Sequence, residues 1–82
     1  MAVDIDNKEL NNYNSNLKRI RVSRGMTQGD LSTLTGINIK SIASYEQDPK
    51  KINKASVEKV LKLCDCLNCN ISDIIEKKYL NI

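Results

Sequence analysis

The residues best suited to chemistry are three cysteines, Cys64, Cys66 and Cys69, which stand close together in the C-terminal part of the chain. Thiols bind metals, form disulfides and act as nucleophiles. A zinc site needs four ligands, normally in two separated pairs, and the chain contains no histidine to complete one. The cysteines also lie in an apolar pattern, which does not suit the disulfide framework of a small secreted protein. We therefore expect structural thiols in the core, with redox sensing as the alternative and no metal.

Other residue sets from which active sites are built are missing. An enzyme needs an activated nucleophile, an acid–base pair or a metal held in a cleft. The 82 residues hold no histidine, no glycine-rich phosphate loop and no catalytic cysteine motif. A chain of this length forms one domain and buries only about 60% of its unfolded surface. We expect no enzyme, no cofactor and no small-molecule ligand.

The charges favour one part of the chain. Residues 16–54 carry eight basic and three acidic side chains, whereas residues 1–15 have a net charge of −2 and residues 55–82 are balanced. This distribution favours an anionic partner, although an ordinary solvated face would give the same excess.

Composition also bears on the compartment. Apolar residues make up 40% of the chain and charged residues 28%, as in globular domains that fold. No apolar run approaches the ~18 residues that span a bilayer. The first seven residues carry acids where a signal peptide is basic and then apolar. We expect a cytoplasmic protein without a membrane partner.

Helical spacing dominates the sequence, and no run has the alternating, β-branched pattern of strands. Tyr13, Leu17 and Ile20 recur at steps of four and three, which predicts a first helix over residues 12–24. Gly25 then supplies the residue that tolerates a left-handed backbone at a helix end.

Two short helices follow. Thr27, with Asp30 three residues later, caps the start of the second helix, and Gly36 ends it. Leu31 and Leu34 are expected to form its buried face. Asn38 caps a third helix only two residues beyond Gly36, with Ile42 and Tyr45 pointing inward, so the connection must be a tight corner.

The remaining elements are a loop and two more helices. Pro49 and the surrounding charges predict a loop over residues 47–54. A fourth helix should start at Ala55 or Ser56, end at Leu67, and bury Val57, Val60, Leu61, Cys64 and Leu67. Ser72 can cap a short fifth helix that carries Ile74, Ile75 and Tyr79.

The segment from Thr27 to Gln47 is the most informative. It encodes a capped helix, a glycine corner and a second capped helix with one polar face. A small side chain is needed where the two helices cross, and Ser32 provides it. Such a helix-turn-helix can project its second helix into a DNA major groove about 12 Å wide.

Residues from about Tyr13 to Ile75 resemble the lambda-repressor and Cro type of helix-turn-helix domain, the XRE family of bacterial and phage DNA-binding proteins. Gly29 departs from the family pattern, because glycine is unfavourable inside a helix. The matching positions lie at close to the family's spacing: Leu17, Ile20, Arg21, Gly25, Met26, Thr27, Gln28, Leu31, Gly36, Ile42, Glu46, Leu67 and Asp73.

The resemblance implies a compact, all-α, five-helix domain that binds duplex DNA and regulates transcription, most simply as a repressor. The family reads bases with the first turn and exposed face of the third helix. Lys40 can donate to guanine N7 and O6, and Ile39 can touch a thymine methyl group. Ser41 is left between groove and scaffold. The base-reading set is therefore Asn38, Ile39, Lys40, Ala43 and Ser44.

The resemblance also implies phosphate contacts and a structural ion pair. Gln28 opens the second helix and is expected, with Thr27, to contact a DNA phosphate. The lysines of the following loop, Lys50, Lys51 and Lys54, are phosphate candidates, with mobile solvated side chains as the alternative. Arg21 and Glu46 match the family's salt bridge between its first and third helices.

One recognition helix covers few base pairs, so we expect a homodimer on DNA. Ile75, Tyr79, Leu80 and Ile82 are the favoured dimer contact, with packing on the chain's own core as the alternative. The expected organisation is an N-terminal arm over residues 1–11, the domain over 12–76 and a tail over 77–82. The alternative function is a protein-binding module, such as an antitoxin or assembly subunit.

Overall fold

The computed structural model of the protein describes residues 15–80, and this part of the chain is helical with no strand. The prediction of an all-helical domain is confirmed. In chain order the elements are α2 (Asn16–Ser23), α3 (Gln28–Thr35), α4 (Ile39–Gln47), the 3-10 helix η1 (Pro49–Lys54), α5 (Val57–Leu67), α6 (Ile71–Ile74) and the 3-10 helix η2 (Lys77–Tyr79).

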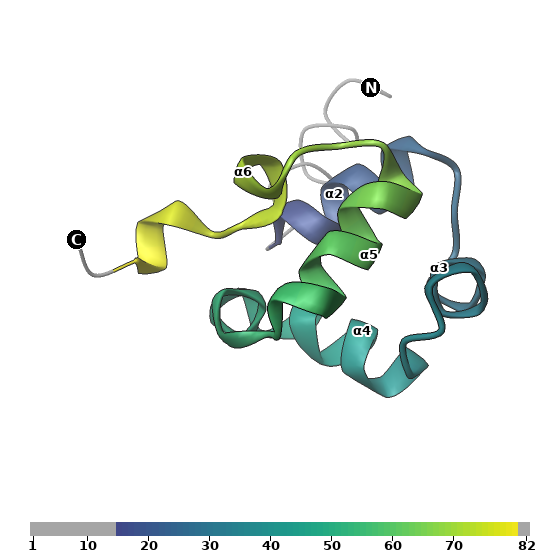
Figure 1. Cartoon of the computed structure of the whole chain (residues 1–82), viewed down its shortest axis with the longest axis horizontal. Coiled ribbons are helices and arrows are strands. Elements are labelled where there is room, and N and C mark those ends of the chain that lie inside the picture. The colour runs from purple at the N-terminus through teal and green to yellow at the C-terminus, as the bar shows by residue number, and fades with distance from the viewer. Residues whose placement is uncertain (1–14, 81–82) are drawn as a thin grey trace, which may run out of the picture.

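Helix α5 runs through the centre of the domain, and α2, α3, α4 and α6 surround it (Figure 1). The η2 segment extends away from this body. The shared core consists of Leu17, Ile20, Leu31, Ile37, Ile42, Tyr45, Ile52, Val60, Leu63, Cys64, Leu67 and Ile74. Across the described range, no helix is long and apolar enough to cross a membrane.

The first described helix starts later than the sequence predicts. Ser15 has an extended backbone, and its side-chain oxygen accepts a hydrogen bond from the Lys18 amide at 3.0 Å. It is therefore the N-cap of α2, because a capping hydroxyl satisfies an amide that the helix leaves free. Because Ser15 is not helical, the prediction of one helix running from residue 12 through this position is wrong. Tyr13 lies outside the described residues. The helix ends before Gly25, which has a φ of 71°.

The helix-turn-helix corner forms as predicted. Thr27 caps α3 through a reciprocal pair of hydrogen bonds with Asp30, and Gly36 ends the helix with a φ of 74°. The Ser32 hydroxyl donates to the Ile37 carbonyl at 2.6 Å, which ties α3 to the turn. Asn38 caps α4 by accepting from the Lys40 amide at 2.7 Å. Only the residues from Gly36 to Asn38 separate the two helices.

The predicted buried face of α3 is partly wrong. Leu31 is fully buried, but Leu34 is 64% exposed and Thr35 is buried in its place. The Thr35 hydroxyl donates to the Leu31 carbonyl and accepts from the Ile37 amide. These bonds turn the Thr35 side of the helix toward the corner, so that Leu34 faces outward.

The predicted stripe of α5 needs a similar correction. Val57 is 69% exposed and Leu61 49% exposed, whereas Leu63 is fully buried. Val57 lies in the first turn, and Leu61 stands about 100° around the helix from Val60, at the edge of the buried arc. The helix itself begins at Val57, because Ser56 accepts from the Lys59 amide as its N-cap.

Two predictions for short segments are also wrong. Residues 49–54 form a 3-10 helix instead of a loop, since Pro49 fixes a helical φ at its start and Ile52 is buried against the core. Helix α6 is capped by Asn70 rather than Ser72. The Asn70 amide donates to the Asp73 carboxylate at 2.8 Å, so α6 begins at Ile71.

Candidate nucleic-acid interface

Helix α4 has one side in the core and one side in solvent. Ile42, Tyr45 and Glu46 are buried, while Ile39 is 45% exposed and Lys40 is exposed. The side chains at positions 39, 40, 43, 44 and 47 lie on neighbouring rows, since residues three and four apart share a helix face. The exposed ridge of α4 therefore carries mainly small and polar groups and one cation.

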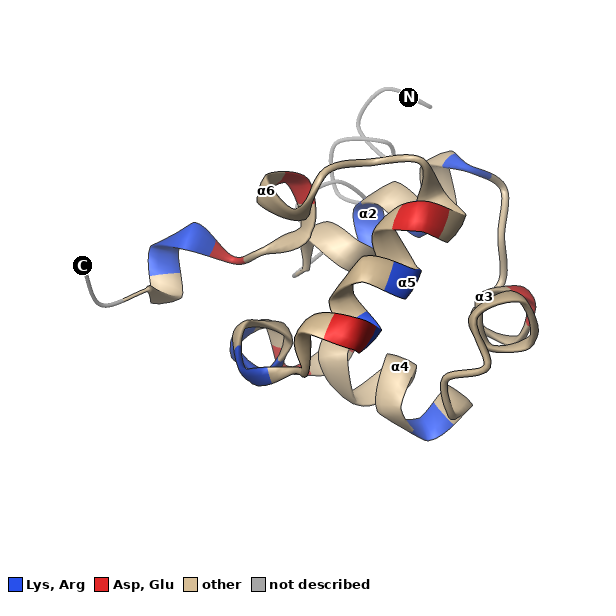
Figure 2. Ribbon diagram, viewed as in Figure 1, with Lys and Arg blue, Asp and Glu red and all other residues tan. Residues whose placement is uncertain are grey.

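The first turn of this ridge is the part most exposed to solvent. Asn38 and Lys40 are both exposed, and Figure 2 shows basic colour at the start of α4, on the outside of the molecule. The Asn38 side-chain oxygen accepts from the Lys40 amide, and the Asn38 amide nitrogen keeps two hydrogens that it can donate. The Lys40 ammonium can likewise donate to an acceptor outside the protein.

The second turn brings two sets of predicted residues together. Ala43 and Ser44 are half-buried, and the Lys51 ammonium of η1 donates to the Ser44 hydroxyl at 3.0 Å. Ser44 can still donate its own hydrogen. Lys50 and Lys54 are exposed on the same 3-10 helix, which groups three cations beyond the C-terminal end of α4 (Figure 2).

The N-terminus of α3 contributes backbone donors. The amides of Gln28 and Gly29 have no partner within the helix, because the first turn has no preceding carbonyls. Thr27 is exposed, and its side-chain oxygen accepts from the Asp30 amide. The backbone amide and the side chain of Thr27 lower the pKa of the Asp30 carboxyl, so this acid is ionised at neutral pH. Its negative charge lies beside the free amides.

The Gln28 side chain is not fully free for an outside ligand. Its amide nitrogen donates one hydrogen to Glu46 Oε1 at 3.0 Å. An amide nitrogen has two hydrogens, so the second can still reach an acceptor. This contact could not be predicted from the sequence, since residues 18 positions apart on two helices meet only in the folded chain.

Arg21 and Glu46 hold α4 in place from the inside. Arg21 Nε lies 2.6 Å from Glu46 Oε2, Arg21 Nη2 lies 3.0 Å from Oε1, and Arg21 Nη1 donates to the Met26 carbonyl at 2.6 Å. The side chains are only 9% and 3% exposed. Together with Gln28, this buried network joins α2, the α2–α3 turn, α3 and α4.

Gln47 is a candidate that the sequence analysis missed. It is exposed at the last turn of α4, seven residues after Lys40 and four after Ala43. The same periodicity that selected Ala43 predicts this position, but Gln47 had been assigned to the following loop.

A short capped helix, a glycine turn and a second helix with an outward polar ridge define the helix-turn-helix class of DNA-binding domains. The sequence model of the Cro/C1-type HTH DNA-binding domain matches residues 16–78, and the chain belongs to this family. The family is defined by DNA binding rather than by a catalysed reaction. No curated protein and no solved structure matches the chain significantly.

Proposed function

We propose that the protein is a sequence-specific transcriptional regulator that binds duplex DNA by inserting α4 into the major groove. The observation that carries this proposal is the two-sided character of α4. Its inner side is fixed by Ile42, Tyr45 and the buried Glu46, and its outer side presents donors and a cation to solvent. A rigid helix with a free polar ridge is what direct readout of base edges requires.

The base-reading set that we propose starts at the first turn of α4. Lys40 donates to guanine N7 or O6, Ile39 contacts a thymine methyl group, and the Asn38 amide donates to an acceptor at the groove edge. Ala43 and Ser44 face the next base pair, and we add Gln47 at the far end of the ridge.

Phosphate contacts are proposed on either side of this ridge. The free amides at the N-terminus of α3, with Thr27 and the second hydrogen of the Gln28 amide, suit one phosphate. The Asp30 carboxylate repels an anion, so this phosphate lies on the Thr27 side of the helix end. Lys50, Lys51 and Lys54 suit the strand that borders the other end of α4.

We further propose that the protein acts as a homodimer and as a repressor. Two copies on half-sites about one helical turn apart double the number of bases that are read. Tyr79 is 43% exposed and Leu80 39% exposed, which leaves the tail available as a contact between copies. A repressor can act simply by occupying its operator, because the bound protein then excludes other proteins from the same DNA.

The function is tested by fluorescence anisotropy with a labelled duplex of mixed sequence at a series of salt concentrations. Each phosphate that the protein neutralises contributes about −0.9 to the slope of log affinity against log salt. We expect a steep negative slope from the several cations and free amides. Absence of binding, or a flat slope, would instead favour the protein-binding module.

A further inference from the structure

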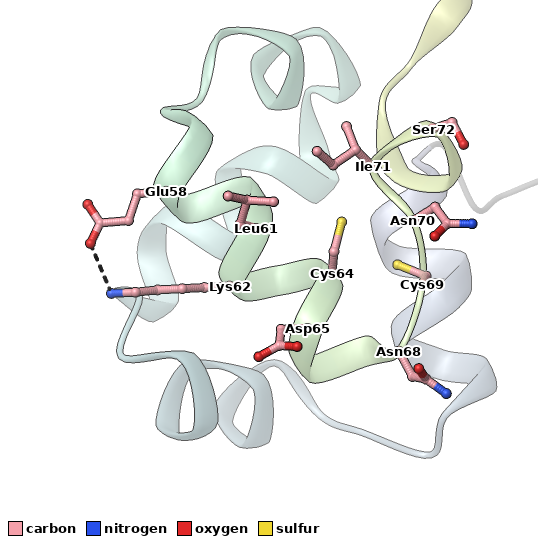
Figure 3. A pocket seen from close by; sticks show the side chains of 10 residues that line it. All are labelled: Glu58, Leu61, Lys62, Cys64, Asp65, Asn68, Cys69, Asn70, Ile71 and Ser72. Carbon is pink, nitrogen blue, oxygen red and sulfur yellow. Dashed lines mark ion pairs between the residues drawn. The ribbon is translucent and has the colours of Figure 1, made fainter.

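Two of the three cysteines meet at the C-terminal end of α5. Cys64 is 6% exposed and Cys69 is half-buried, and the two thiols are close enough for each to influence the pKa of the other. Both side chains line an open pocket between α5 and α6. Figure 3 shows their sulfurs next to each other in this pocket. Neither is in a disulfide.

The backbone brings these residues together. Asn68 takes a left-handed conformation with a φ of 53°, and the Cys69 amide donates to the Cys64 carbonyl at 3.0 Å. This hydrogen bond across the helix end is that of a Schellman turn, in which residues five apart contact each other. A disulfide requires two neighbouring residues whose Cβ atoms can approach each other, and this turn makes Cys64 and Cys69 such neighbours.

The two thiols differ in access and in environment. Burial, together with the nearby Asp73, raises the pKa of Cys69, and the neighbouring Cys64 thiol and Arg24 guanidinium offset only part of this rise. Burial, with the neighbouring Cys69 and Asp73, raises the pKa of Cys64 to about 11. Arg24 is fixed at this corner by donating to the Leu67 carbonyl at 2.8 Å. Cys69 is thus the more accessible partner and Cys64 the buried one.

We propose that Cys64 and Cys69 form a reversible intramolecular disulfide, with a low-molecular-weight disulfide such as oxidised glutathione as the oxidant. The Cys69 thiolate attacks the oxidant, forms a mixed disulfide and expels one glutathione thiolate. Cys64 then loses its proton to water, attacks the Cys69 sulfur and expels the second thiolate. The protein loses two protons and two electrons, and the oxidant becomes two thiols.

Cys66 provides a matched control within the same helix. It is half-buried but lines a different surface pocket, with Leu34, Thr35, Lys62 and Asp65. Cys66→Ser therefore leaves the reacting pair intact, whereas Cys64→Ser and Cys69→Ser each remove one partner.

The test is incubation of the full chain with oxidised glutathione, followed by intact mass measurement and digestion that cuts between Cys64 and Asp65. Wild type and Cys66→Ser should lose two hydrogens in mass, with the residue-64 and residue-69 peptides joined until dithiothreitol is added. The reaction should be faster at pH 9 than at pH 7, because more thiolate is present. Cys64→Ser should accumulate the mixed disulfide at Cys69.

Several results would overturn the proposal. These are an internal disulfide that involves Cys66, unlinked glutathione adducts in the wild type, or persistence of the mass loss in Cys64→Ser or Cys69→Ser. Cys66 and Cys69 share one peptide after this digestion, so fragmentation of the linked wild-type peptides by tandem mass spectrometry assigns the bond to one of them. This assignment needs no substitution and stands even if a serine variant fails to fold.

Discussion

Glu46 is the residue at which three helices meet. Its carboxylate accepts two hydrogen bonds from Arg21 on α2 and one from Gln28 on α3, while its own backbone belongs to α4. Among the described residues, no buried side-chain donor or acceptor is without a partner. A buried charge pair adds little stability beyond a well-packed apolar pair, but removing one partner is costly. Its role is therefore to fix how α4 sits on the domain.

Replacing Glu46 with alanine should lower the free energy of unfolding by roughly 3–5 kcal/mol, because Arg21 would remain as an uncompensated buried charge. Urea denaturation followed by circular dichroism measures this loss. Glu58→Ala is the control, since Glu58 pairs with Lys62 at 3.6 Å on the surface, where both side chains are largely exposed. That variant should change stability by less than about 1 kcal/mol. Equal effects of the two substitutions would contradict the structural role of Glu46.

At the scale of elements, α3 carries a glycine that its conformation does not need. Gly29 has no positive φ, and a Cβ atom there would meet only the Thr27 side-chain oxygen, at 3.7 Å. Gly29→Ala should raise the stability by about 0.4–1 kcal/mol, because the unfolded chain loses freedom. Thermal denaturation would show a higher midpoint. The added methyl group would also lie next to the free backbone amides of α3, where we propose that a DNA phosphate binds. The DNA affinity of the same variant should therefore be measured in parallel.

Gly36→Ala is the matched contrast. It also has open space for a Cβ atom, but its φ of 74° is left-handed. The substitution should cost about 1–2 kcal/mol, since an L-residue is strained there. If Gly36→Ala left the stability unchanged or raised it, the assignment of the helix-turn-helix corner to Gly36 would be wrong.

The sequence predicted the boundaries of the helix-turn-helix corner, which local chemistry sets, although it missed the local caps Ser15 of α2 and Asn70 of α6. Thr27, Gly36 and Asn38 act through their own backbone and near neighbours, so the boundaries of α3 and the start of α4 could be read directly. The prediction of buried residues failed where burial depends on tertiary packing. Leu34 and Leu61 have helical spacing, but whether a neighbouring element covers them depends on packing that no local pattern encodes.

The candidate site shows the same division. Periodicity and the family resemblance selected the ridge of α4, and Asn38, Ile39 and Lys40 are all exposed there. The bond from Gln28 to Glu46 and that from Lys51 to Ser44 join side chains of different elements. Such contacts depend on rotamers and helix crossing, which the sequence does not specify.

At the scale of the whole molecule, the proposed homodimer depends on the C-terminal tail as the contact between copies. A chain truncated after Glu76 loses Tyr79 and Leu80 but keeps the Glu76 carboxylate, which accepts from the Asn16 amide at 2.5 Å at the start of α2. Light scattering should show the mass of a dimer for the intact chain and the mass of a monomer for the truncated chain. The affinity of the truncated chain for its operator should also fall. An unchanged mass together with unchanged affinity would exclude the tail as the contact between copies.

The central claim is that the outer ridge of α4 reads base edges. The most direct measurement is the affinity of wild type and of Lys40→Ala for a duplex selected from random sequences, with a mixed duplex for comparison. Lys62→Gln, which removes a cation from α5, is the control. Lys40→Ala should lose about 1–3 kcal/mol, roughly 5- to 150-fold in affinity, on the selected duplex and much less on the mixed one, while Lys62→Gln binds both normally. Unchanged affinity of Lys40→Ala for the selected duplex, or an equal loss in Lys62→Gln, would contradict the claim.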